Sequence, residues 1–108
     1  MKISIIDNDG KLQIKIQDTN FELNIKNLIV ENIVTLSNIY STDWVARKTI
    51  EAGISAGATV FWACDEEKNH VCILVGEDDE LWDFGIVIDC DYFLQEINRF
   101  IYDKPILF

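Results

Sequence analysis

Four side chains that could bind a metal ion or attack a substrate lie in the second half of the chain: Cys64, His70, Cys72 and Cys90. Thiolate and imidazole are ligands that zinc prefers, and a cysteine beside a histidine can act as nucleophile and base. The spacing C-x5-H-x-C follows no zinc pattern, and thiols in apolar segments usually fill space. Nearby acids disfavour a thiolate. We therefore expect no metal and no cofactor.

Two groups of carboxylates also have the residue types for chemistry. The segment Asp7-x-Asp9-Gly10 resembles the start of a calcium loop, but Ile5 and Ile16 stand where the EF-hand pattern needs acids, so we expect a hairpin turn. Neighbouring side chains in extended chain point to opposite faces, so the adjacent acids of residues 77–80 are not expected to pair. With one histidine and no phosphate-binding loop, the sequence predicts a non-enzymatic protein.

Negative charge is the strongest signal in the sequence. The 108 residues carry 19 acids against 9 Lys and Arg, a formal charge of −10. Residues 1–40 are nearly balanced, whereas residues 41–108 hold most of the excess acids. A charge concentrated in one part of a fold makes a directed field, which attracts a basic protein and repels nucleic acid and anionic membranes. An odd number of cysteines without C-x-x-C indicates free thiols in a reducing compartment.

Three apolar runs of strand length organise the second half of the chain: Ala58–Cys64, Val71–Val75 and Leu81–Ile88. The breaks between them are short and acidic, too short for a crossover helix, so neighbouring runs should pair antiparallel. The middle run should be buried on both faces. The meander would form a rigid platform with its densest negative charge on the turns.

The first half of the chain alternates between apolar and polar residues. Residues 3–6, 11–17 and 21–26 predict a three-stranded meander with one wet face. Apolar residues then recur at three and four positions over residues 27–40, which predicts a helix.

Residues 44–52 return to a period of two, with apolar residues at even positions, and predict a strand paired with residues 58–64. Residues 91–103 have a helical apolar stripe, Pro105 should end that helix, and the last three residues should form a packed tail. The sequence thus predicts one α+β domain with about seven antiparallel strands and two helices.

The turns of this predicted sheet collect the acids in two groups that we expect to contact a partner. Because alternate strands reverse direction, one group should gather at one end of the sheet: Asp43, Asp65, Glu66, Glu67, Asp89 and Asp91. The other should lie at the opposite end: Glu77, Asp78, Asp79 and Glu80. The three tryptophans are expected in the core, with a position at the interface as the alternative for Trp44.

Residues 43–53, followed by Ala58-Thr-Val-Phe-Trp-Ala63, resemble small immunity proteins of bacterial contact-dependent growth inhibition systems. Residues 5–16 are similar to the N-terminal part of one such group. The resemblance implies a cytoplasmic protein that binds a delivered toxin domain one-to-one and blocks its active site. Many such toxins are nucleases, including ribonucleases, with basic surfaces that the acidic turns would complement.

Two alternatives remain open from the residues alone. One is an acidic regulator that mimics nucleic acid toward another basic protein, and a neighbouring toxin gene would separate it from an immunity protein. The other is a small metal or thiol enzyme that uses Cys64, His70 and Cys72, and retention of zinc after dialysis would identify it.

Overall fold

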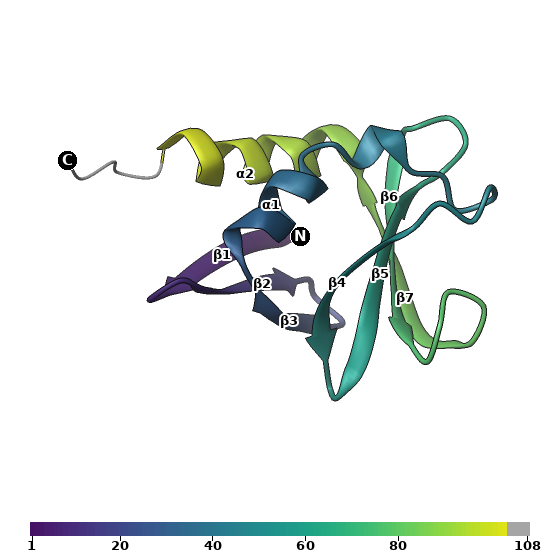
Figure 1. The fold of residues 1–108 in the computed structure, drawn as a ribbon, viewed down its shortest axis with the longest axis horizontal. Coiled ribbons are helices and arrows are strands. Elements are labelled where there is room, and N and C mark those ends of the chain that lie inside the picture. The colour runs from purple at the N-terminus through teal and green to yellow at the C-terminus, as the bar shows by residue number, and fades with distance from the viewer. Residues whose placement is uncertain (104–108) are drawn as a thin grey trace.

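Seven strands form one antiparallel sheet in which each strand pairs with the next along the chain (Figure 1). This computed structural model describes residues 1–103. The strands are β1 (Lys2–Asn8), β2 (Lys11–Gln17), β3 (Glu22–Leu28), β4 (Ile50–Ser55), β5 (Ala58–Cys64), β6 (His70–Gly76) and β7 (Trp82–Asp89). The helices are α1 (Val30–Leu36), the 3-10 helix η1 (Ile39–Ser41) and α2 (Cys90–Asp103). The predicted α+β fold is confirmed, and the tail predicted around Pro105 lies outside the described residues.

The helices cover one face of the sheet, which we call the inner face; the opposite face is the outer face (Figure 1). Trp62 on β5 is fully buried on the inner face, with its ring 5.6 Å from that of Phe93 on α2. Its indole N–H donates a hydrogen bond to the Ala52 carbonyl at 2.8 Å. Ile33 of α1 and Ile97 of α2 complete the same core. The inner face therefore holds the main hydrophobic core, and little of it remains for binding.

The alternating pattern of the N-terminal strands is confirmed by burial. Leu12, Ile14 and Ile16 on β2 are each at most 1% exposed, and their polar neighbours face outward. β6 follows the expectation of two buried faces, since Ile73 is buried toward the helices and Leu74 on the outer side. Trp44, in the connection before β4, lies beside Leu74 and Cys72 on the outer face of β6.

The sheet bends between β3 and β4, where only the pair Lys26 and Ile54 is in register (Figure 1). β1–β3 extend to the left in Figure 1, and β4–β7 stand upright on the right. The helix predicted over residues 27–40 is shorter, because residues 27–28 belong to β3 and Asn27 has a φ of 60°. Thr35 and Ser37 bond backbone carbonyls at the end of α1, which competes with further helix.

The strand predicted over residues 44–52 was wrong in its first half. Residues 43–48 form a tight loop, and β4 begins only at Ile50, although its pairing with residues 58–64 is confirmed. The Asp43 carboxylate accepts hydrogen bonds from the N–H groups of Val45 and Ala46, and Arg47 has a φ of 62°. These local bonds bend the chain, and the resulting 43–48 loop projects on the outer side of the sheet (Figure 1).

Candidate protein-binding surface

The cysteine and histidine side chains are divided between the two faces of the sheet. Cys64 and Cys90 are buried in the inner core, whereas Cys72 pairs in register with Val87 and lies on the outer face. Burial raises the pKa of the Cys64 thiol to about 12, assisted by the neighbouring Cys90, and burial also raises the pKa of Cys72. A cysteine nucleophile needs the opposite shift. His70 is exposed, with its Nδ1 2.8 Å from the Asp65 carboxylate, whereas Cys64 is buried in the inner core.

The first acidic group gathers where the β5–β6 turn meets the start of α2. The Asn69 carbonyl accepts a hydrogen bond from Cys90 N at 2.9 Å, which joins the turn to α2. Lys68 donates to the Thr42 carbonyl and lies 3.7 Å from Asp43, which joins the turn to the 43–48 loop. Three separate segments thus place their carboxylates at one end of the sheet.

Most carboxylates of the first group also hold local structure. Asp65 accepts from Asn69 N, and the hydrogen bond with His70 is the main cause that lowers the pKa of the Asp65 carboxyl. Asp89 accepts from Tyr92 N in the first turn of α2, and Asp91 accepts from the Tyr40 hydroxyl. Glu66 and Glu67 are exposed at the tip of the turn, and Glu67 accepts a hydrogen bond from the Asn69 side chain. The tip therefore offers exposed charge that is less tied to the local backbone than that of Asp65 or Asp89.

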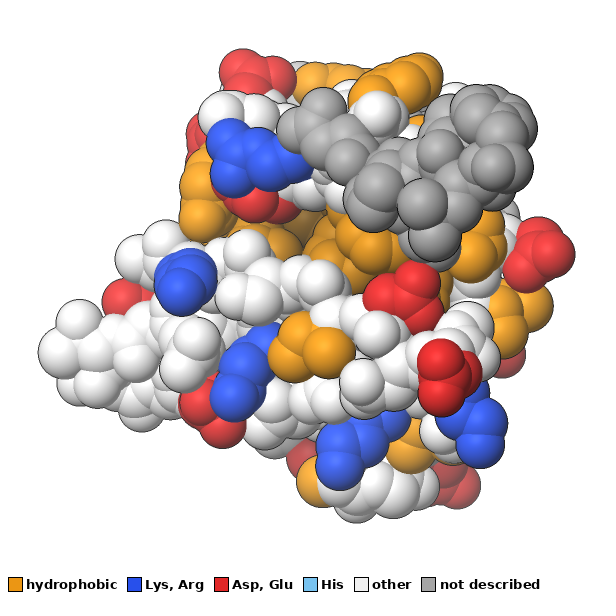
Figure 2. Space-filling view, turned by 90° about the vertical axis from the view of Figure 1, so that its left-hand side faces the viewer, with side chains coloured by type: hydrophobic (Ala, Val, Ile, Leu, Met, Phe, Trp, Pro, Cys, Tyr) orange, Lys and Arg blue, Asp and Glu red, His pale blue; other side chains and the backbone are white. Residues whose placement is uncertain are grey.

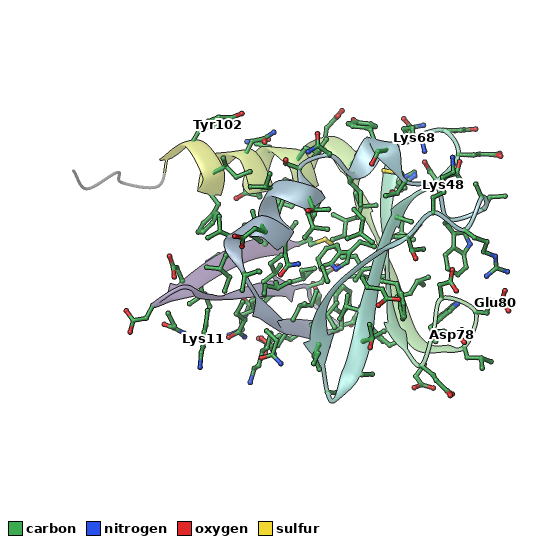
Figure 3. The ribbon with its side chains drawn as sticks, viewed as in Figure 1. Lys11, Lys48, Lys68, Asp78, Glu80 and Tyr102 are labelled. Atoms are coloured by element: carbon green, nitrogen blue, oxygen red, sulfur yellow. The ribbon has the colours of Figure 1, made fainter. Side chains whose placement is uncertain are left out.

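The second acidic group, at the β6–β7 turn, is linked to the 43–48 loop by one arginine. Arg47 lies 3.1 Å from Glu80 and 3.9 Å from Asp79. Asp78 instead holds the turn itself, accepting hydrogen bonds from Glu80 N and Leu81 N. The 43–48 loop thus reaches both acidic groups, which lie at opposite ends of the sheet as predicted. Figure 3 places Asp78 and Glu80 on the same side of the molecule as Lys48 and Lys68, far from Lys11.

Between the two acidic groups lies an apolar slot on the outer face of β6 and β7. Its volume is about 230 Å³, and Trp44 and Trp82 are its largest side chains. The remaining lining residues are Cys72, Leu74, Gly85, Ile86 and Val87. Trp44 is half-buried and Trp82 is 44% exposed, so the expectation of a core position holds for Trp62 but was wrong for Trp82.

Three exposed apolar side chains in this region were not predicted as binding residues: Val87 lines the slot, Val45 follows Trp44 in the chain, and Leu81 precedes Trp82. The apolar run Leu81–Ile88 predicted a strand, and β7 is the last strand of the sheet, with most of its residues exposed. The order of strands, which places β7 at the edge, was the signal that could have identified them. We call the slot, these residues and the two acidic groups together the acidic–aromatic face.

The opposite side of the molecule has a different character. Figure 2 shows lysine and arginine side chains scattered among acids and polar atoms over the N-terminal strands. Charge on the molecule is therefore uneven, as the two halves of the sequence predicted. No helix within residues 1–103 combines the length and apolarity needed to cross a membrane.

Scans against protein-family models, curated proteins and solved structures found no match to this chain.

Proposed function

We propose that this protein is an immunity protein that binds a basic toxin domain one-to-one and neutralises it by covering its active site, the toxin being a nuclease, most simply a ribonuclease. The observation that carries the proposal is the acidic–aromatic face, where two groups of carboxylates flank an exposed apolar slot. A nuclease must present positive charge to bind phosphates, so an acidic surface of this kind competes for the same groups.

The two parts of the face have separate physical roles. The carboxylates at the turn tips, such as Glu66 and Glu67, are solvent-exposed and act over distance, which raises the rate of encounter with a basic surface. Trp44 and Trp82 offer large apolar area with few rotatable bonds, which is typical of residues that slow dissociation. Steering by charge and retention by aromatic contact suit an inhibitor that must act quickly and remain bound.

The toxin domain is first captured from the native host and identified by mass. The test then measures its association rate with this protein by stopped flow at several salt concentrations. In one variant, lysines replace Asp65, Glu66 and Glu67; in a second, they replace Glu77, Asp78, Asp79 and Glu80. We expect slower association and a flatter salt dependence for the first. The effect of the second should be smaller, because Arg47 already pairs with Asp79 and Glu80.

A matched control carries lysines at three acids away from the face: Asp18 in the β2–β3 turn, Glu22 on β3 and Glu31 on α1. It changes the net charge as much as the first variant does. Equal slowing by both would mean that net charge alone guides encounter. Wild-type rates for all three variants would contradict the proposal that acids of this face recognise the toxin.

A further inference from the structure

The slot has a fixed position between negative charges on the outer face. Residues opposite each other in the β6–β7 pair lie in the order His70–Asp89, Cys72–Val87 and Leu74–Gly85. Along a strand, four residues span about 13 Å, so Asp89 lies at one end of the slot and the acidic β6–β7 turn at the other. A long side chain that enters the slot would bring its head group close to a carboxylate at either end.

The chain already uses the face of one indole to hold a cation. The guanidinium carbon of Arg47 lies 5.8 Å from the centre of the Trp44 ring, and Glu80 holds the same guanidinium. Arg47 is not among the residues that line the slot. Trp44 and Trp82 both line the slot, and the carboxylates at its two ends favour positive charge there.

Gly85 allows Trp82 to lie against β7. A Cβ added at Gly85 would meet Trp82 Cζ3 at 3.1 Å and Leu74 Cδ2 at 3.0 Å, closer than ordinary van der Waals contact. A side chain at this position would displace the indole from the slot without removing it. The absence of a side chain at Gly85 thus determines the shape of the slot.

We propose that the slot between Trp44 and Trp82 binds an arginine side chain of the basic partner, a subsite that rests on the proposed function. The planar guanidinium stacks on indole better than the compact ammonium of lysine, and its methylene stem suits the apolar floor of Leu74 and Val87. A second copy of this chain is the wrong occupant, because each copy carries −10 and would bring acidic rims together.

The test is a titration of the full chain with two blocked peptides of equal charge, tetra-arginine and tetra-lysine, followed by NMR of the three indole N–H signals. Trp62 is buried and hydrogen-bonded, so its signal is an internal control. We expect the Trp44 and Trp82 signals to shift with tetra-arginine, the Trp62 signal to stay, and tetra-arginine to bind about threefold more tightly than tetra-lysine.

Two variants sharpen the result. Trp82→Ala and Gly85→Ala should each remove the preference for tetra-arginine while leaving the charge-driven binding of tetra-lysine. Val34→Ala, which shortens an exposed apolar side chain on α1 and lies outside the acidic–aromatic face, is the matched control and should keep the preference. The comparison of peptides on the wild-type chain stands even if a variant fails to fold.

Equal affinity for the two peptides, or shifts confined to backbone amides of the acidic turns, would overturn the slot as an arginine subsite. Indole shifts that depend on protein concentration alone, with a dimer in sedimentation, would overturn it in favour of a second copy. Either result leaves the neutralisation proposal to the association experiment, in which the slot residues are unchanged. The two proposals can therefore fail separately.

Discussion

Three tryptophans occupy three different environments, and their exposure ranges from the core to the surface. Trp62 is fully buried between β5 and α2, Trp44 is half-buried on the 43–48 loop, and Trp82 is 44% exposed on the edge strand. Alternation along a single strand could not distinguish them, because burial on the outer face depends on which segment covers it. A core position was expected for all three tryptophans. It is correct for Trp62 and wrong for Trp82, because no segment within residues 1–103 covers the outer face of the edge strand at Trp82.

Replacing Trp62 by Ala should lower the free energy of unfolding by about 3–5 kcal/mol, because it removes a fully buried ring and leaves a cavity. Trp82→Ala should cost less than about 1 kcal/mol, since nearly half of that side chain is already in water. Urea unfolding of both variants measures the difference. Equal losses would mean that Trp82 is structural and would weaken its role in binding.

The pair formed by His70 and Asp65 predicts a specific acid response. The pKa of Asp65 is lowered in the folded protein, so its carboxylate contributes stability above its unfolded pKa and loses that contribution as the pH falls through the folded pKa. We expect the wild type to lose stability below about pH 4 and His70→Ala to lose less over that range. Denaturant melts from pH 5 to pH 2.5 measure this, and identical slopes for the two proteins would contradict it.

Protection against a cognate toxin should survive His70→Ala nearly intact.

At the scale of elements, the 43–48 loop shows where sequence patterns stop being informative. Apolar residues at even positions continue from Trp44 into β4, so period two alone indicates one strand. The hydrogen bonds from Val45 N and Ala46 N to the Asp43 carboxylate, and the contacts of Arg47 with another turn, decide the outcome instead. Most strands and α2 followed from periodicity, and the strand pairing followed from the short breaks between runs. The acidic–aromatic face depends on the 43–48 loop and could not be predicted in this way.

Two glycines of the β4–β5 hairpin test how closely that hairpin packs. Gly53 has a φ of 89°, and an added Cβ would overlap Ile25 Cγ2 and lie 3.1 Å from Leu28 Cδ2. Gly57, with a φ of 81°, has nothing within 4 Å of such an atom. We expect Gly57→Ala to cost about 1 kcal/mol from backbone strain and Gly53→Ala about 2–4 kcal/mol, because overpacking adds to the strain. Thermal unfolding measures both, and equal costs would contradict the close packing of β3 on β4.

At the scale of the molecule, ten excess negative charges act on stability as well as on binding. Repulsion among the acids of the β5–β6 and β6–β7 turns opposes folding, and salt screens it, with a Debye length of about 10 Å at 0.1 M. We therefore expect the melting temperature to rise between about 0.02 M sodium chloride, where screening is weak, and about 0.5 M, where it is strong. The lysine variant of Asp65, Glu66 and Glu67 should show a smaller rise. A melting temperature that falls with salt in the wild type would mean that favourable ion pairs outweigh repulsion.

The order of the strands has a kinetic consequence. Every strand pairs with its neighbour in the chain, so most of the sheet can close through short loops at small entropic cost. Only α2 must travel back to the first strand, where it packs against β1 at the end of the chain's described part. Substitutions in the β5–β6 hairpin, such as Val60→Ala, should therefore slow refolding. Ile97→Val on α2 should mainly accelerate unfolding, because we expect α2 to pack onto the sheet after the strands have paired.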